Sequence, residues 1–501
     1  MKEKILFWIS EEFTHFSIAY YLQKHTDYEL YAIVDVPNRS KKFYQTQKLV
    51  NFKKVWFIHD HIRKKSKNPD IEYLKSIEKK YDLPLWNLMI NERIFYGFFN
   101  FYKFSKDEIL SIEEDICRLF ETIFNKIKPN FFLTKEPAKH HLELLYRMAL
   151  KNNVIPLVLS FTNLGYRVML SKKTNEPDVK FDRNKIISKN RTFTDFQKFL
   201  KNENFVAQQK KYDSRLTESN INFFKAGLQY IFQNTNTNTH YHYYGKTKSK
   251  VFTYFLKSFF KRKMRKNFLD SLNSEIDFNQ PFVYFPLGVS MKRTLLIDSP
   301  YFTNQLEVIR HISKSIPVNF QVFVKETQTQ ASRDWRPISF YKEIMKIPNV
   351  KLLSHNIPSD IILKNCLLVM TIRGSTGLEA AFYNKPSIVF SNIHYAQLPS
   401  VRLVKELDSL PKIIKEALNT NVNPSDVDRY LTFLEENTIE FDWYDFSSKY
   451  QNLMNYGGNL HDVEISEFKA KQFLETSKSI IEKLTFEHMK KLKWYKENEI
   501  N

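Results

Sequence analysis

Residues 366–390 read CLLVMTIRGSTGLEAAFYNKPSIVF and carry the clearest structural pattern in the chain. The apolar run Cys366–Ile372 predicts a buried strand, and the shorter apolar run Ser387–Phe390 predicts a neighbouring one. Between them, a turn of Gly, Ser and Thr residues leads into a predicted helix, Thr376–Tyr383. A strand, a helix and a strand in this order indicate a βαβ unit, and therefore a parallel sheet.

The same alternation of strands and helices occurs in two parts of the chain. Around this unit, strands are predicted at 282–285, 320–324 and 350–353, with helices at 304–316 and 338–346. Near the N-terminus, strands are predicted at 4–9, 31–35, 55–58, 131–133 and 155–159, with an amphipathic helix at 106–128. We therefore predict an α/β protein with two Rossmann-like domains, residues 1–169 and 280–420, that face each other across a cleft.

The remaining segments lack this alternation. Residues 170–279 contain polar runs and are expected to form a linker and a helical insertion, and residues 421–501 are expected to be helical, without a strand. Residues 246–266 carry nine basic residues and no acidic one, interleaved with five aromatic residues. One interpretation is a helix that packs its aromatic side chains on the core. Another is a basic–aromatic helix on an anionic membrane surface, and nucleic acid, for which no known binding motif is present, is the third.

Composition excludes several classes of protein. The chain has 501 residues and a formal net charge of +21, which reflects either a solvated surface or attraction to an anion. Its nine glycines form neither a GxGxxG dinucleotide fingerprint nor a P-loop, and there is no GxSxG or HExxH motif. Two distant cysteines predict no disulfide framework or cysteine zinc site. With no signal-peptide pattern or long apolar run, we expect a cytoplasmic protein.

The first candidate site is the turn between Thr371 and Ala380. At the carboxyl end of a strand, the backbone N–H groups of Gly374, Ser375 and Thr376 and the positive end of the following helix are suited to hold a phosphate. Glu379 would then accept hydrogen bonds from ribose hydroxyls. The alternative is an ordinary turn with a Ser or Thr N-cap, in which Glu379 only complements the helix dipole.

Two further candidate groups follow strand ends. Lys325 and Glu326 come after the strand at 320–324, and Arg333 and Arg336 follow, so these cations would neutralise a phosphate or diphosphate unless they are only surface charges.

In the first domain, Glu136 precedes the neighbouring residues His140 and His141, and a carboxylate near imidazoles is suited to nucleophilic or acid–base chemistry. The alternative is a set of solvated loop and capping residues. We predict no metal site, because the pairs His59/His61 and His240/His242 lack partners at ligand spacing along the chain.

These segments together resemble the capsule polysaccharide biosynthesis family, which includes Kdo transferases. The resemblance covers roughly 280–400, and weakly the segment EPAKHHLELLYRMA at 136–149. The family's pattern Gly-Thr/Ser-x-Gly-x-Glu-Ala, followed by Lys-Pro, is matched from Gly374 to Pro386, and Lys325-Glu326 match the start of a Lys-Glu-His-Pro motif. The chain departs from the family at Thr327 and Gln328, which replace His-Pro, at Asn384, which replaces Gly, and at 290–294, where an acidic residue is missing.

The resemblance implies a GT-B-like glycosyltransferase, with the nucleotide-sugar donor on the C-terminal domain and the acceptor on the N-terminal one. It further implies a CMP-linked sugar acid as donor, a glycan or lipid-linked acceptor at the inner face of the membrane, and no metal or resident cofactor. Glu136 is the expected catalytic carboxylate, and Asp298, otherwise a turn residue, is the second candidate. Two alternatives stay open: a nucleotide-sugar epimerase of the same fold, and a non-catalytic sugar-nucleotide-binding or assembly protein, which the loss of His-Pro favours.

Overall fold

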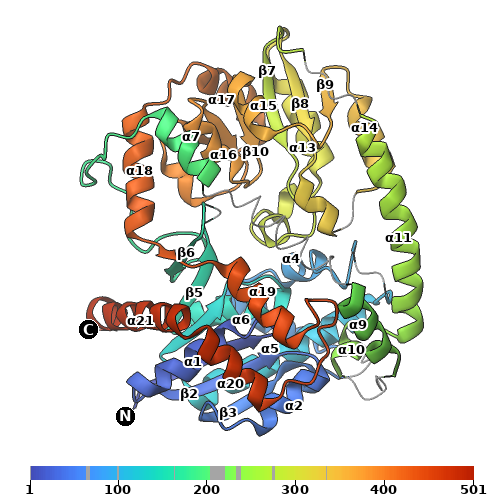
Figure 1. The fold of residues 1–501 in the computed structure, drawn as a ribbon, viewed down its shortest axis with the longest axis vertical. Coiled ribbons are helices and arrows are strands. Elements are labelled where there is room, and N and C mark those ends of the chain that lie inside the picture. Colours follow the sequence, from blue (N-terminus) through green and yellow to red (C-terminus); the bar gives the residue numbers. More distant parts are fainter. Residues whose placement is uncertain are drawn as a thin grey trace.

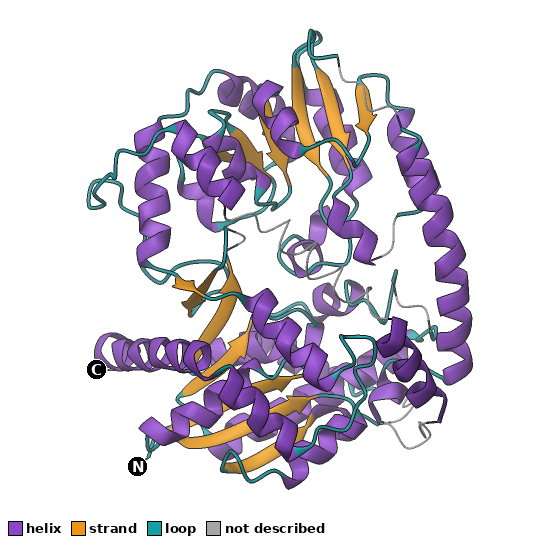
Figure 2. Cartoon of the chain, in the orientation of Figure 1, coloured by secondary structure: helices purple, strands orange, loops and turns teal. Residues whose placement is uncertain are grey.

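Two sheets, one mixed and one parallel, organise the molecule in the computed structural model (Figures 1 and 2). The structure describes residues 2–500 except 64–67, 99–100, 163, 203–219, 233–238, 273–276 and 334–335. Within this part of the chain, the α/β class with two Rossmann-like domains is confirmed.

The N-terminal sheet has seven strands in the order β13-β6-β5-β4-β1-β2-β3. Strands β1 to β5 are mutually parallel, whereas β6 pairs with β5 and β13 in antiparallel fashion. The strands are β1 Lys4–Ser10, β2 Glu29–Asp35, β3 Phe52–Phe57, β4 Phe131–Lys135, β5 Ile155–Phe161, β6 Arg167–Ser171 and β13 Ile439–Glu440. Their helices are α1 Thr14–His25, α2 Asn38–Thr46, α3 Ile71–Tyr81, α4 Leu85–Ile90, α5 Lys106–Ile127 and α6 His140–Lys151. Helix α5 begins with a complete capping box, in which Ser105 and Glu108 satisfy each other's backbone N–H groups.

The C-terminal sheet has six strands, all parallel, in the order β12-β11-β10-β7-β8-β9. The strands are β7 Phe282–Pro286, β8 Gln321–Lys325, β9 Val350–Leu353, β10 Leu368–Thr371, β11 Ser387–Val389 and β12 Val401–Leu403. Its helices are α12 Arg293–Leu296, α13 Gln305–Ser315, α14 Ile338–Met345, α15 Ser359–Asn365, α16 Thr376–Phe382, α17 Leu410–Leu418 and α18 Pro424–Glu436. Because both faces are covered, the central strands are uninterrupted apolar runs, such as the fully buried β10.

The chain crosses between the two domains more than once. Helix α7 (Phe193–Asn202) belongs to the C-terminal domain, where Phe196 stacks on Phe382 with ring centroids 5.3 Å apart. After α18 the chain returns to the N-terminal sheet as β13, a strand that we did not predict, since two residues give no pattern. Helices α19 (Trp443–Met454), α20 (Glu467–Thr476) and α21 (Lys478–Tyr495) then complete the N-terminal core.

The insertion adds α9 (Asn220–Phe232), α10 (Thr239–Tyr243) and the long helix α11 (Lys248–Asp270). Figure 1 shows α11 running along one side of the molecule from one domain to the other. Near its start, Tyr254 packs on Phe101 of the N-terminal domain, and near its end Phe268 stacks on Tyr341 of the C-terminal domain. Helix α11 therefore contacts both domains and connects them along one side.

Candidate functional site

Both sheets reverse their strand order at one point, and these two points lie at the candidate site. The reversal falls between β1 and β4 in the N-terminal sheet, and between β7 and β10 in the C-terminal sheet. In open parallel sheets, ligands bind outside the carboxyl ends of the strands at such a switch point. Glu136 directly follows β4, Arg293 and Asp298 follow β7, and Arg373 follows β10.

The guanidinium of Arg293 joins the two domains at this point. Its Nη1 lies 2.6 Å from Asp298 Oδ1 and 3.5 Å from Glu136 Oε1, and its Nη2 lies 3.9 Å from Glu143 Oε2. The Arg293 side chain is only 7% exposed. The two carboxylates predicted for catalysis, one in each domain, therefore meet on one buried cation.

Each carboxylate has a second partner. Glu136 also accepts a hydrogen bond from the Asn175 amide, and Asp298 also pairs with Arg373. Glu143, on α6, accepts a hydrogen bond from Arg147 one turn further along the helix, at 2.8 Å. Asp298 is thus more than a turn residue, since it lies between two guanidiniums.

The electrostatics around Arg373 suit an anion. Burial and the positive charge of Arg293 together lower the pKa of Arg373 to about 10, whereas Glu136 acts in the opposite direction. The guanidinium of Arg293 therefore repels that of Arg373. An incoming phosphate or carboxylate would relieve this repulsion, since Arg binds such groups in bidentate fashion.

The Gly374 turn adjoins this cluster. The N–H of Gly374 donates to Thr371 Oγ1 at 3.0 Å, whereas the N–H groups of Ser375 and Thr376 have no acceptor among the described residues. Ser375 is the N-cap residue of α16, but its side chain makes no capping hydrogen bond. The turn therefore lacks the side-chain cap of an ordinary helix start, and the N–H groups of Ser375 and Thr376 are available to an anion.

The hydroxyl of Ser375 instead donates to Glu379 Oε1 at 2.7 Å. Burial raises the pKa of Glu379, although the Ser375 hydrogen bond and the charge of Lys325 act in the opposite direction. A neighbouring glycine, Gly377, is required for packing, because a Cβ there would lie 2.4 Å from the Tyr395 hydroxyl.

Three other predicted binding residues have partners inside the C-terminal domain. Lys325 donates to the Ile357 carbonyl at 2.6 Å and to Ser359 Oγ at 2.8 Å. Glu326 is fully buried and forms an ion pair with Arg336. The side chains predicted to contact the nucleotide thus hold the loops around the strand ends in this structure.

The Glu326–Arg336 pair has further partners inside the C-terminal domain. Glu326 also accepts a hydrogen bond from the Tyr341 hydroxyl at 2.8 Å, and Arg336 donates to the Gly288 carbonyl. Gln328, which replaces a family residue, donates to the His355 carbonyl at 3.1 Å. Arg333 lies in the 3-10 helix Gln328–Arg333, with a side chain outside the described set.

A second polar cluster lies at the carboxyl edge of the N-terminal sheet. His140 and His141 are buried rather than solvated, being 1% and 0% exposed. His140 is hydrogen-bonded through Nδ1 to Glu113 Oε2, at 2.8 Å, and through Nε2 to the Tyr243 hydroxyl, at 2.7 Å. The Tyr243 hydroxyl also lies 3.3 Å from His141 Nδ1. His141 Nε2 in turn lies 3.2 Å from Asp35 Oδ2. Tyr243, on α10, thereby connects the insertion to the N-terminal domain.

The surroundings shift the pKa values of His140 and His141 in opposite directions. Burial alone would lower the pKa of His140, but the Glu113 carboxylate raises it above its usual value. Burial lowers the pKa of His141 to about 4, although Asp35 opposes the shift. Titratable groups with diverging pKa values are frequent at functional sites.

Sequence reasoning missed Arg293, Asp35, Glu113 and Tyr243. Arg293 follows β7 as Lys325 follows β8, so the strand-end signal was present, although segment 290–294 departs from the family pattern by lacking an acid. Asp35 ends the predicted strand 31–35 and was open to the same reasoning. Tyr243 and His240 come from the insertion, and no pattern in the sequence places that segment against the sheet edge.

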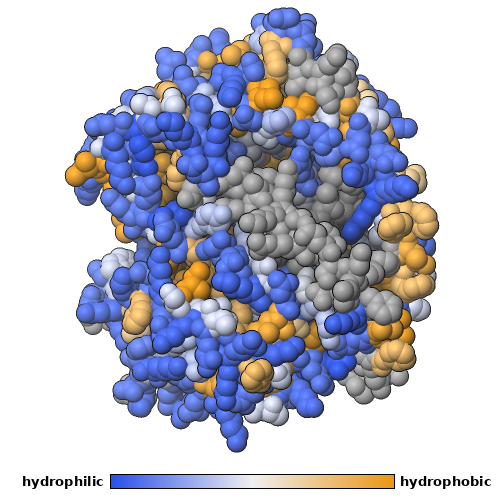
Figure 3. Space-filling model, viewed as in Figure 1, coloured by the Kyte–Doolittle hydropathy of each residue, from blue (hydrophilic) through white to orange (hydrophobic). Residues whose placement is uncertain are grey.

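The structure also describes the basic helix. Phe252, Phe259, Phe260 and Met264 are 62%, 62%, 65% and 62% exposed, so the aromatic residues of the middle of α11 do not pack on the core. Figure 3 shows hydrophobic residues along the margin that α11 occupies. No helix in the described part of the chain is long and apolar enough to span a bilayer.

Two Rossmann-like domains with their switch points joined define the class of the molecule, a GT-B-like α/β fold. Residues 179–398 match the family model described as capsule polysaccharide biosynthesis protein, which confirms the resemblance over this region. The match begins at the segment that leads into α7 and includes the Gly374 turn. No curated protein matches the chain.

Solved structures with detectable similarity include enzymes of nucleotide sugars. UDP-GlcNAc 2-epimerase from Methanocaldococcus jannaschii is 13% identical, over 87% of this chain and 100% of that chain, with a TM-score of 0.25. KpsC from Thermosulfurimonas dismutans, a beta Kdo 2,7 transferase, is 11% identical, over 62% of this chain and 79% of that chain, with a TM-score of 0.30. At these scores, the fold assignment depends on the sheets themselves.

Proposed function

We propose that the protein is a glycosyltransferase that moves a sugar from a nucleotide-sugar donor to a surface-polysaccharide or glycolipid acceptor. The observation that carries the proposal is the meeting of both switch points at Arg293, within a chain whose residues 179–398 match the capsule polysaccharide biosynthesis family. If each substrate binds at the strand ends of one domain, the two would meet at Arg293, and this placement supports transfer between them.

The donor belongs on the C-terminal domain. Its phosphate would accept hydrogen bonds from the N–H groups of Ser375 and Thr376, at the positive end of α16. Arg373, which precedes the turn, would add charge. Glu379, with a raised pKa, lies one turn into α16 and is suited to hydrogen-bond a ribose hydroxyl. A CMP-linked sugar acid is the donor we propose.

The chemistry belongs to the carboxylates on Arg293. During transfer, the bond between the anomeric carbon and the donor phosphate breaks, and the electron pair leaves with the nucleotide. The acceptor hydroxyl forms the new glycosidic bond and loses its proton. Glu136 is our candidate for nucleophile or base, and Asp298 is the second. A donor phosphate that binds Arg293 would release Glu136 from its ion pair.

The test combines binding with turnover. Thermal unfolding is measured with CMP, UDP and GDP, each at about a hundred times its dissociation constant, where a ligand stabilises the folded state by about 2.7 kcal/mol. Selective stabilisation by CMP supports the proposed donor, and stabilisation by UDP or GDP replaces the donor but keeps the nucleotide site.

Turnover of the matching sugar nucleotide is then compared in wild type, Glu136→Gln and, as a control, Glu307→Gln on the exposed face of α13. Loss of turnover with retained binding in Glu136→Gln supports transfer. Binding without turnover in any protein, including wild type with a panel of acceptors, indicates an assembly protein instead. Interconversion of the free sugar nucleotide would identify an epimerase.

We further propose that α11 places the enzyme on an anionic membrane at the inner face, where a lipid-linked acceptor would lie. The helix carries eight basic residues and no acid before Asp270, and it exposes Phe259 and Phe260. Phe259→Ser/Phe260→Ser should weaken binding to phosphatidylserine vesicles by at least about tenfold, since each buried Phe contributes about 1.5–3 kcal/mol. The control is Val318→Ser, a fully exposed residue elsewhere. Equal binding of all three proteins would refute this role.

A further inference from the structure

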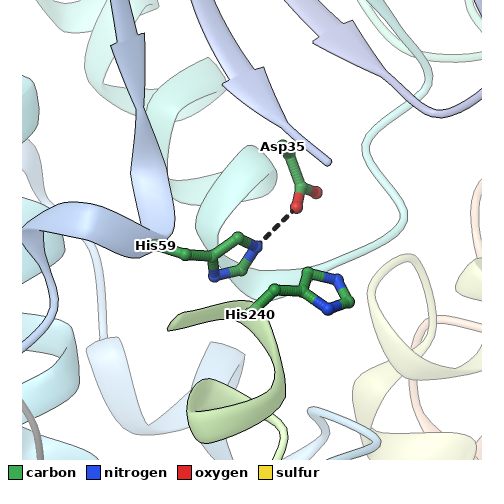
Figure 4. Close-up of side chains that lie close together, drawn as sticks. All are labelled: Asp35, His59 and His240. Atoms are coloured by element: carbon green, nitrogen blue, oxygen red, sulfur yellow. Dashed lines mark hydrogen bonds and ion pairs between the residues drawn. The ribbon is translucent and has the colours of Figure 1, made fainter. Parts of the chain in front are cut away.

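Three buried side chains from three separate elements converge at the edge of the N-terminal sheet. Asp35 is the last residue of β2, His59 lies in the 3-10 helix Ile58–His61 directly after β3, and His240 lies on α10. They are 3%, 5% and 7% exposed. Because β2 and β3 are parallel neighbours, their carboxyl ends meet, and α10 covers this edge from the insertion (Figure 4).

Their geometry is that of an incomplete coordination sphere. One ligand atom from each side chain lies within 4.8 Å of the other two. His59 Nε2 is 2.9 Å from Asp35 Oδ1, and the rings of His59 and His240 meet edge to face with centroids 4.8 Å apart. The His59 nitrogen that faces Asp35 is thus Nε2, which is the atom that an ion shared with Asp35 would bind.

The other oxygen of Asp35 is already occupied. Lys139 Nζ lies 2.8 Å and His141 Nε2 lies 3.2 Å from Asp35 Oδ2. The contact with His141 is of the kind that orients a ligating carboxylate, and both contacts leave Oδ1 as the oxygen that faces the two imidazoles. The set available at the centre is therefore one carboxylate oxygen and two imidazole nitrogens.

We propose that Asp35, His59 and His240 bind a divalent metal ion of the zinc class, which fastens α10 to the edge of the N-terminal sheet. Two imidazoles and one carboxylate favour Zn²⁺ and related first-row ions over Mg²⁺ or Ca²⁺, which prefer oxygen ligands. Three protein ligands leave one position of a tetrahedral ion for water. This inference does not depend on the proposed glycosyl transfer, since neither Glu136 nor the Gly374 turn takes part.

The positive charge of Lys139 lies beside the proposed metal site. The Lys139 ammonium repels a cation at the same carboxylate. Removing it while keeping an apolar chain of similar length, as in Lys139→Met, should therefore tighten metal binding. An ordinary salt-bridge cluster without a metal function would gain no metal affinity from this change.

The experiment uses the full chain and Co²⁺ and Zn²⁺ as probes. Protein stripped with a chelator is titrated with Co²⁺, whose visible absorption reports a site with nitrogen ligands, and Zn²⁺ then competes for it. We expect one equivalent in wild type. In His240→Ala, affinity should fall at least about tenfold, since even indirect changes at a metal site cost about 10–100-fold. His25→Ala, at the exposed end of α1, is the matched control and should bind as wild type does.

His240 is on a short helix of the insertion, so its replacement leaves the sheet residues in place, and circular dichroism checks the fold. Tighter binding in Lys139→Met, together with weaker binding in His240→Ala, establishes the site. Absence of a cobalt spectrum in both wild type and Lys139→Met overturns the proposal. Equal affinity of His240→Ala and wild type also overturns it, because the ion would then be bound elsewhere.

Discussion

Replacing Arg293 by Met tests whether one cation holds the two domains together at the proposed reaction centre. The substitution keeps an apolar side chain of similar length and removes a charge that faces Asp298, Glu136 and Glu143. Removing one partner of a buried ion pair costs about 3–5 kcal/mol, because the other charge stays buried without compensation.

The structure places the expected cost at the lower end of that range. Only the contact to Asp298, at 2.6 Å, is short, and each carboxylate keeps another partner. We therefore expect Arg293→Met to lower the free energy of unfolding by about 3 kcal/mol. With an unfolding entropy of about 2.1 cal/mol/K per residue, this lowers Tm by about 3 °C if all 501 residues unfold together.

Urea denaturation of wild type, Arg293→Met, Asp298→Asn and the double variant measures the coupling between the two residues. We expect a coupling energy of at least about 1 kcal/mol, because contacting residues in one network are not additive. Arg310→Met, an exposed arginine paired with Glu307 on α13, is the control and should cost less than about 1 kcal/mol. A loss in Arg293→Met no larger than in the control, or additive single changes, would refute the reasoning.

Three further predictions concern packing and pH. Gly377→Ala should lower the free energy of unfolding by about 1–3 kcal/mol in urea, and Tyr395→Phe should recover part of the loss, because the new Cβ would lie 2.4 Å from the Tyr395 hydroxyl. Glu113→Gln should lower stability most below pH 6.5, with the difference from wild type vanishing as pH rises through the raised pKa of His140; a pH-independent difference would contradict this. Burial lowers the pKa of His394 to about 4, so wild type should lose stability as pH falls from 6.5 to 4, and His394→Gln should show less of this loss in thermal melts across that range.

The fold was largely predictable because its signals are local. The run Cys366–Ile372 is apolar because β10 is covered on both faces, and the Gly/Ser/Thr turn after it is where a parallel strand must give way to a helix. The helical end of the chain was also recognised. Its position was not, since the return to the N-terminal core depends on contacts such as that of Phe473 with Phe13, whose ring centroids lie 5.8 Å apart, far away in sequence.

The site was predictable only in part, for a related reason. Functional side chains often gather at strand ends, and this rule selected Glu136 and the Gly374 turn, which follow β4 and β10 at the two switch points. It cannot say which charges will be used internally. Lys325 and Glu326 also follow a strand end, yet their side chains bond to neighbouring loops of the same domain. Arg293 lies in the segment that departs from the family pattern by lacking an acid, and it makes the contact between the two domains.

Charged side chains are buried where the two domains meet. A purely structural contact would be served as well by apolar side chains, because buried ion pairs contribute little net stability. Arg293 instead holds the Glu136 and Asp298 side chains close together in a buried place, at the cost of their desolvation. Such an arrangement is useful when a ligand can replace one partner, since a phosphate would take the guanidinium and leave a carboxylate free beside the sugar. The domain contact and the proposed catalytic centre would then be the same set of atoms, so donor binding would both loosen the contact and activate Glu136.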